Sequence, residues 1–398
     1  MNPPRIGIIF PPEFWRLPLE IGAAHCYFVE QQKRELPTPY VFIGSSAGGI
    51  AAACSVAWTE SHFLYLRRVI RNLKPEQIYK STLRDKIAGT FFIADSAFHF
   101  LTSGEKFPWW KKLIFAGGSL GTKIGVIYEI LRAPSAFSNE PLLNLLKKNL
   151  DFDAVFNSPI KLEILTLDKE TREKIIYTNY IASDKKPERL IDGLAGTSAL
   201  PLIFPCRQNG EKLMVDGAVH PLNTMPFYRA LENDCDVIIV LQFAPFNDKE
   251  LSGCTAGLKI VSQCFNITTS EIGSILLRGF INRNQDLEAK NKIESLVGEL
   301  GALASKRTSW WNKLGLSKKD EFFTKIDEIR KTCSEFSFTE MKNVKILVTK
   351  IDPKLLLPLS IHKFKPEQMK LMLDLGYEAM GPVLDDLEKI LKEKPSCA

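Results

Sequence analysis

The sequence is short of the residues that build metal centres and redox sites. Its eight cysteines contain no C-x-x-C pair, and the cysteines and the five histidines form no cluster with zinc-ligand spacing. This spacing predicts neither a structural zinc site nor a thiol–disulfide motif. We therefore expect no metal and no other cofactor, and we expect the cysteines to be reduced thiols, as in a reducing compartment.

Long hydrophobic runs are also missing. No apolar window approaches the roughly 18 residues that a membrane-spanning helix needs. The amino-terminal stretch MNPPRIGIIFPPEF has two prolines before a short apolar run, which is not the pattern of a signal peptide. We expect a cytoplasmic protein that associates peripherally with membranes, with non-classical secretion as the alternative.

Neither sign of charge dominates the chain. The 52 Lys and Arg residues stand against 46 Asp and Glu residues, which gives a net charge of +6. This excess is too small to predict nucleic-acid binding, and no basic run carries interleaved aromatic residues. A mild positive charge does suit a membrane surface that contains anionic lipids.

What the 398 residues do contain is an alternation of short β-rich runs with helical ones. Several β-rich runs are apolar on both faces, as strands of a buried parallel sheet are. The predicted strands are residues 5–10, 40–44, 160–168, 174–180, 236–243 and 344–350. The predicted helices include residues 19–35, 139–150, 225–234 and 365–393. This pattern predicts an α/β fold with a mostly parallel central sheet between helices.

The predicted domain organisation is one catalytic domain with an insertion. Residues 1–250 carry most of the β-rich runs, whereas residues 251–340 are helix-like and more polar. Residues 341–398 then supply one more strand and a last helix, which we expect to complete the first domain. A separate small domain at 251–340 is the alternative to a helical insertion.

One predicted strand ends on two adjacent serines. In YVFIGSSAGGIAAAC, residues 40–54, only Gly44-Ser45-Ser46-Ala47-Gly48 fits the pattern G-x-S-x-G. Between a strand and a helix, this pattern is typical of a nucleophile elbow, whose serine sits on a sharp and strained turn. The glycines allow the strand and the helix to pass closely. Ordinary turns also contain the pattern, but its place between a strand and a helix favours Ser46 as a nucleophile.

A serine nucleophile needs a base, and the sequence offers two kinds. A Ser-His-Asp triad would use His220 or His362, although neither follows a strand end with an acid at the usual spacing. The other three histidines lie in patterns typical of packing or surface residues. The more suggestive base is Asp216 in LMVDGAVHPLNTMP, residues 213–226, where a short apolar strand leads onto a glycine turn. An Asp-Gly pair is also common in hairpin turns.

Together these motifs resemble those of the patatin-like phospholipase family. That family uses a Ser–Asp dyad without histidine, and the matching residues here are Ser46 in GSSAG and Asp216, followed by Gly217, in DGA. Three further stretches agree, namely GAAHCYFVEQ at 22–31, AGTSALPLIFPC at 195–206 and FKPEQMKLMLDLGYEAM at 364–380. The resemblance covers about 1–245 and 343–392. It implies a three-layer α/β/α fold with a nucleophile elbow.

The sequence departs from the family at the segment that binds the oxyanion. The family's loop, G-G-G-x-[RK]-G, directly follows the first strand, but here that strand is followed by PPEFWRLPLEIGAAH. Aligned on Gly22, the three glycines become residues 17–19, and Pro18 has no N–H to donate. We expect the Ala47 amide to remain as a donor, supported by Gly22 or by the side chain of Arg16. Lipid or an activating protein partner is expected to order this segment.

Two tryptophan pairs suggest how the protein would meet a lipid surface. They occur with lysine close behind, in PWWKKLIF at 108–115 and SWWNKLGL at 309–316. Aromatic rings with a polar edge beside Lys suit the headgroup boundary of a bilayer. Buried aromatic clusters, or a lid over the active site, are the alternatives.

The resemblance therefore implies a lipid acyl hydrolase of the phospholipase A or lysophospholipase type. Ser46 and Asp216 would form the catalytic dyad, and a phospholipid or lysophospholipid at a membrane surface would be the substrate. Two other hypotheses remain open. One is a catalytically weak patatin-fold protein that binds a membrane or a partner, and the other is a Ser-His-Asp esterase.

Overall fold

The computed structural model describes residues 3–12, 16–81, 135, 137–201, 203–243, 275–278, 281, 344–351 and 365–392. The chain divides into two compact units, Met1–Ser274 with Ile346–Ala398, and Ile275–Lys345. The fold described below is that of the first unit. Both tryptophan pairs and almost all of the predicted insertion at 251–340 lie outside the described residues, so the predicted domain boundaries stay a prediction.

The described residues form one main sheet of eight strands in the order β10-β9-β1-β2-β5-β8-β7, with β6 paired to β5. Its strands are β1 (Ile6–Phe10), β2 (Val41–Ser45), β5 (Lys161–Asp168), β6 (Lys174–Thr178), β7 (Arg207–Asn209), β8 (Lys212–Asp216), β9 (Val237–Val240) and β10 (Lys345–Val348). A separate two-stranded pair joins β3 (Lys80–Ser81) to β4 (Phe137–Ser138).

The centre of the main sheet is parallel. Strand β1 pairs in parallel with both β2 and β9, and β2 pairs in parallel with β5. Strands β6 and β8 run antiparallel to β5, and β7 runs antiparallel to β8. All five residues of β1 and of β2 are buried, because helices cover both faces of a parallel sheet. Each of the six predicted strands is present; β2 is shifted by one residue, and the other five are shorter than predicted.

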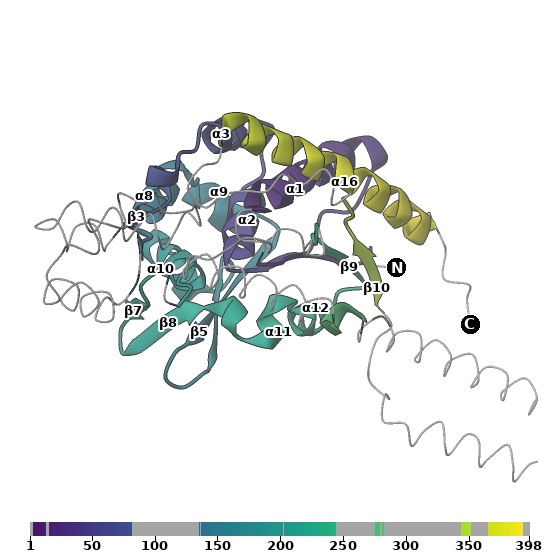
Figure 1. Ribbon diagram of the computed structural model, residues 1–398. Helices are drawn as coiled ribbons and strands as arrows, with labels where there is room; N and C mark the ends of the chain where they lie inside the picture. Colours follow the sequence, from purple (N-terminus) through teal and green to yellow (C-terminus); the bar gives the residue numbers. More distant parts are fainter. Residues whose placement is uncertain are drawn as a thin grey trace, which may run out of the picture. The chain divides into compact units, whose positions relative to one another are not determined.

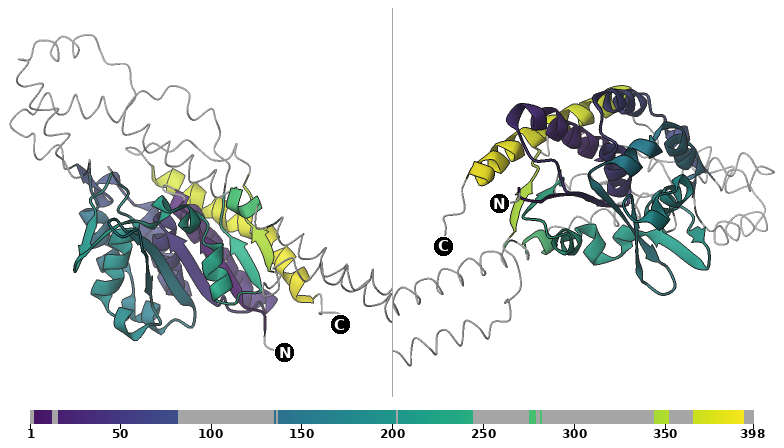
Figure 2. Two further views of the ribbon diagram at one scale, coloured as in Figure 1. Left: turned by 90° about the horizontal axis from the view of Figure 1, so that it is seen from below. Right: turned by 180° about the vertical axis from the view of Figure 1, so that it is seen from behind.

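Helices lie on both sides of this sheet (Figure 1). They are α1 (Leu17–Arg34), α2 (Ala47–Val56), α3 (Glu60–Arg71), α8 (Glu140–Asn149), α9 (Phe152–Asn157), α10 (Pro187–Thr197), α11 (Pro221–Thr224), α12 (Phe227–Glu232) and α16 (Pro366–Lys392). Short 3₁₀ turns span Pro75–Gln77, Ala182–Asp184 and Gly217–Val219. Helices α1, α2 and α16 lie on one side, and α11 and α12 lie on the other, as Figure 2 shows from two further directions. The predicted α/β fold is confirmed.

Helices α1 and α16 cross in close contact, and two glycines permit it. A Cβ atom on Gly22 would lie 2.1 Å from the Leu373 carbonyl oxygen, and one on Gly376 would lie 2.0 Å from the Leu19 carbonyl oxygen. Neither distance leaves room for a side chain. The crossing attaches the last described helix to the first one, which completes the layer above β1 and β2.

Candidate active site

The sheet brings Ser46 and Asp216 together through a shared edge of β5. Residues 161–165 of β5 pair with β2 along one edge, and residues 163–167 pair with β6 along the other. Strand β8 pairs with residues 166–168 of β5. Because β6 occupies the other edge of β5, β8 lies on the same edge as β2 and follows it along β5. Ser45 lies opposite Leu165, and Asp216 lies opposite Thr166. The end of β2 and the end of β8 therefore meet at consecutive positions of β5.

Ser46 occupies a strained turn between β2 and α2. Its φ of 54° and ψ of −132° are rare for a residue with a side chain. The flanking glycines make the turn possible, because a Cβ atom on Gly44 would lie 2.4 Å from the Gly48 carbonyl oxygen. A Cβ atom on Gly48 would lie 2.1 Å from the carbonyl oxygen of Phe10, at the end of β1. This is the geometry that the G-x-S-x-G pattern predicts for an elbow.

Thr197 holds the elbow from the end of α10. Its hydroxyl accepts a hydrogen bond from the Ser46 amide (2.7 Å) and donates one to the Leu165 carbonyl (2.7 Å). Thr197 is not among the residues predicted from the sequence. It lies in the stretch 195–206, but no local pattern marks a threonine that acts on a strand far away in the sequence.

The two adjacent serines have different environments. The Ser45 hydroxyl is fully buried and donates to the Asn223 carbonyl (2.7 Å), which ties β2 to the segment after Asp216. Ser46 is 4% exposed and lines a pocket that Asp216 also lines. Of the two, only Ser46 is therefore placed to meet a substrate.

Asp216 is the last residue of β8, and its carboxyl group is fully buried. Oδ1 accepts a hydrogen bond from the Ala218 amide (2.9 Å), while Oδ2 has no hydrogen-bond partner of regular geometry among the described residues. Burial raises the pKa of Asp216 to about 7, against smaller lowering effects of the Ser46 side chain and the Ala218 amide. A carboxyl group with such a pKa suits a general base near neutral pH. The next residue, Gly217, packs closely against β5, since a Cβ atom there would lie 2.3 Å from the Leu165 carbonyl oxygen.

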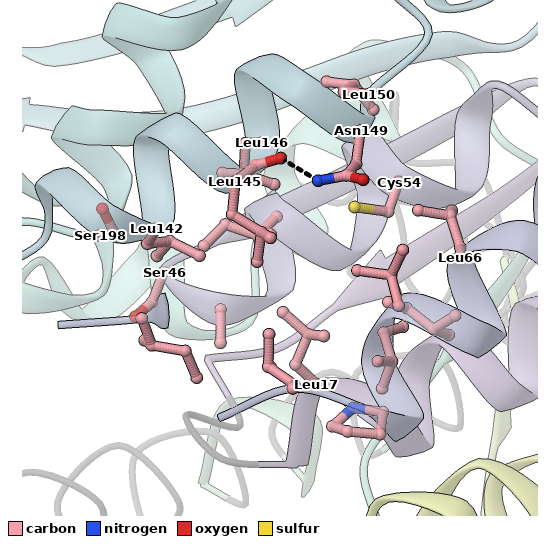
Figure 3. A pocket seen from close by; sticks show the side chains of 18 of the residues that line it. Leu17, Ser46, Cys54, Leu66, Leu142, Leu145, Leu146, Asn149, Leu150 and Ser198 are labelled. Atoms are coloured by element: carbon pink, nitrogen blue, oxygen red, sulfur yellow. Dashed lines mark hydrogen bonds between the residues drawn. The ribbon is translucent and has the colours of Figure 1, made fainter. Parts of the chain in front are cut away.

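The pocket that holds these two side chains is otherwise almost entirely apolar. More than half of the lining residues are leucine or isoleucine, and most of these belong to α1, α2, α3 and α8. Figure 3 shows Ser46, Ser198 and Leu142 at one end, and Cys54 and Asn149 toward the other. At that far end Tyr65 donates a hydrogen bond to Asn149, whose amide donates to the Leu145 carbonyl (2.6 Å). Such a pocket suits an alkyl chain whose polar end lies at Ser46.

The altered oxyanion segment reaches this pocket at its carboxyl-terminal end. The carbonyl groups of Phe10 and Pro11 lie against Gly48, and Leu17 and Pro18 line the pocket. Ala47 also lines the pocket, and its amide, at the first position of α2, has no partner within the helix. Arg16 directly precedes α1 and is absent from the described pocket lining. Residues 13–15 lie outside the described part of the chain.

The structure places Gly22 in a helix and not in an open loop. This residue lies inside α1, where it packs against the backbone of α16. Because an amide in the helix interior bonds to a carbonyl four residues earlier, it is not free to hold an oxyanion. Gly22 is therefore a packing residue.

The described histidines lie away from the pocket. Nδ1 of His220 accepts a hydrogen bond from the Leu222 amide (3.3 Å) at the start of α11. His25 stacks on Phe63, and burial lowers its pKa to about 4. None of His25, His62 and His220 is among the residues that line the pocket, and His99 and His362 lie outside the described residues.

The described residues contain neither a candidate metal centre nor a candidate membrane-spanning helix. No group of three or more His, Cys, Asp or Glu side chains there is arranged to hold a metal ion. Among the described helices, none has the length and apolar character that crossing a membrane requires.

One of three comparisons with known proteins shows the family of this chain. No curated protein sequence matches the chain. Among solved structures, the chain is similar to VipD from Legionella pneumophila, with 12% sequence identity, a TM-score of 0.38, and coverage of 97% of this chain and 67% of that one. Residues 15–231 match the family model described as patatin-like phospholipase. This match spans more than half of the sequence and includes Ser46 and Asp216, so the chain belongs to the patatin-like phospholipase family.

Proposed function

We propose that this protein hydrolyses fatty-acyl esters of phospholipids or lysophospholipids through Ser46 and Asp216. Its family generally acts on lipid acyl esters. One observation carries the proposal for this chain, namely that the two side chains line the same, otherwise apolar pocket. An ester bond at Ser46 would leave the acyl chain among the leucine and isoleucine side chains, where its burial is favourable.

In the proposed mechanism, the ionised Asp216 carboxylate accepts the hydroxyl proton of Ser46 while Oγ attacks the ester carbonyl. The tetrahedral oxyanion would receive a hydrogen bond from the Ala47 amide at the start of α2. Collapse of this intermediate expels the alcohol, which takes the proton from Asp216, and leaves an acyl–Ser46 ester. Asp216 then accepts a proton from water, whose oxygen attacks the acyl carbonyl, and the fatty acid leaves as Ser46 recovers its proton.

One feature favours a second candidate, a membrane- or partner-binding protein with weak catalysis. Pro18 lies at the pocket where the family's glycine loop would supply amides, and it has no N–H. Loss of one oxyanion donor typically lowers kcat by about 10²–10³. Lipid, or an activating protein partner, would then be needed to bring other amides of the segment toward Ser46.

A hydrolysis panel separates these candidates. The purified protein is offered phospholipids and lysophospholipids, with released fatty acid as the readout, and is compared with Ser46→Ala and Ser45→Ala. We expect release by the wild-type protein, none above background by Ser46→Ala, and retained release by Ser45→Ala, because the Ser45 hydroxyl only anchors Asn223. Equal release by Ser46→Ala and the wild-type protein would contradict the proposal.

A further inference from the structure

A groove separate from the apolar pocket lies between α3 and the start of α16. Arg67, Arg68 and Arg71 of α3 line one wall, and Glu367 and Lys370 of α16 line the other. Arg71 lies three positions after Arg68 and four after Arg67, so its side chain is a neighbour of both along α3. Figure 1 shows the first turns of α16 beside α3. Four cationic side chains and one carboxylate therefore meet in this groove.

Most of this positive charge is not neutralised within the described structure. Arg67 forms an ion pair with Asp374, which links the two helices. Arg68, Arg71 and Lys370 are exposed and form no ion pair with a described residue. The Nε atom of Arg67 is buried and has no hydrogen-bond partner among the described residues. The groove thus holds spare N–H donors and net positive charge, which favour an anionic, oxygen-rich ligand.

An exposed leucine lies in the groove beside the cations. Leu64, which lines the groove, is 53% exposed, and Leu371, the residue after Lys370 on α16, is a further exposed leucine (39%) outside the groove lining. A soluble phosphate would gain nothing from these leucines, whereas a lipid surface offers them acyl chains below its phosphate groups. The combination therefore favours a lipid surface over a free anion.

The two helices that line the groove, α3 and α16, also line the acyl pocket. On α3, Leu66 and Ile70 face the pocket while Arg67 and Arg71 line the groove. On α16, Met369 lines the pocket and Lys370 lines the groove. Contact of the groove with a membrane would bring the wall of the acyl pocket to the lipid.

We propose that the groove between α3 and α16 binds the phosphate groups of anionic lipids and docks the protein on membranes that contain them. This inference rests on the proposed lipid substrate. It assigns to Arg68, Arg71 and Lys370 a role in membrane recognition that is separate from the chemistry at Ser46.

Vesicle sedimentation tests the proposal without depending on catalysis. All proteins carry Ser46→Ala, so that turnover cannot alter the vesicles. Vesicles of phosphatidylcholine alone are compared with vesicles that also contain phosphatidylglycerol. The test variant is Arg68→Gln/Arg71→Gln. The matched control is Lys169→Gln/Lys185→Gln, which removes the same charge from exposed residues elsewhere on the domain.

We expect the parent protein to bind only the vesicles with phosphatidylglycerol, and salt to weaken this binding. The test variant should bind about 30-fold more weakly, at roughly fivefold per cation removed, and the control should bind nearly as well as the parent. Equal binding by the two variants, or no vesicle binding by the parent, would overturn the proposal. Calorimetric binding of inorganic phosphate that only the test variant loses, without vesicle binding, would also overturn it and assign the groove to a soluble anion.

Discussion

The backbone amide of Ser46 donates a hydrogen bond to Oγ1 of Thr197, 151 positions away in the sequence. Because the same hydroxyl donates to the Leu165 carbonyl, one side chain ties the elbow to β5. The strained backbone of Ser46 is thus held in place from outside its own strand and helix. Thr197 is a positioning residue in this account, since it is absent from the residues that line the pocket.

Removal of the Thr197 hydroxyl should loosen the elbow. In Thr197→Val, the Ser46 amide and the Leu165 carbonyl lose their partner, which we expect to cost about 1–3 kcal/mol of unfolding free energy. We expect kcat to fall about tenfold or more with little change in KM, because the fault lies in the geometry of Ser46. Thr197→Ser restores the hydroxyl and should recover most of the rate. Steady-state kinetics of both variants check this. An unchanged kcat in Thr197→Val would show that Thr197 does not position Ser46 for catalysis.

The pH dependence of hydrolysis should report the buried carboxyl group. Proton transfer from Ser46 needs ionised Asp216, whose pKa burial raises to about 7. We therefore expect kcat/KM to fall about tenfold per pH unit below pH 7 and to level off above it. Rates with a soluble ester from pH 5 to pH 9 measure this, so that lipid charge does not interfere. A profile that stays flat down to pH 5 would exclude Asp216 as the base.

Ionised Asp216 should also lower the free energy of unfolding at pH values above its pKa. Its pKa is raised in the folded state, so the folded protein holds the proton more tightly than the unfolded chain. This contribution favours folding below about pH 4 and is lost as the pH rises to about 7. Asp216→Asn avoids the buried charge and should be more stable than the wild type at pH 8, by up to about 4 kcal/mol, with a smaller difference at pH 4. Denaturant unfolding at both pH values checks this, and a variant that is less stable at pH 8 would contradict it.

The spacing of pocket residues on α2 predicts an acyl-chain length. Ser46, Ile50 and Cys54 all line the pocket and are four positions apart. At 1.5 Å per residue, Ser46 and Cys54 lie about 12 Å apart along the helix, which fits roughly ten extended carbons. Ile50→Trp should block this path and shift the preferred ester to shorter chains, whereas Leu64→Trp, outside the pocket, should not. Rates over a series of p-nitrophenyl esters measure the shift, and an unchanged preference in Ile50→Trp would place the acyl chain elsewhere.

Local patterns in the sequence predicted most strands of the main sheet, the elbow and the aspartate turn, but not β7. The apolar runs at β1, β2 and β9 predicted a buried, mostly parallel sheet. The glycines around Ser46 predicted the sharp turn before α2. What local patterns could not give is the order of strands, because β2 and β8 share an edge of β5 only after folding. For the same reason Thr197 was missed.

Gly22 illustrates the opposite error. The glycine that opens GAAHCYFVEQ was expected to support the oxyanion, but its neighbour in the structure is Leu373, far along the chain. Close helix crossing and open backbone for a ligand both require glycine, so the residue type alone does not separate the two roles.

Labelling of Ser46 by a fluorophosphonate tests the central claim most directly. The reagent needs both an activated serine and a site that accepts a tetrahedral oxyanion, and peptide mass spectrometry locates the adduct. We predict an adduct on Ser46, in the free protein or once vesicles are added, that is absent from Ser46→Ala and slowed at least a hundredfold in Asp216→Asn. A folded protein that stays unlabelled with and without vesicles, or carries the adduct on another serine, would contradict the account.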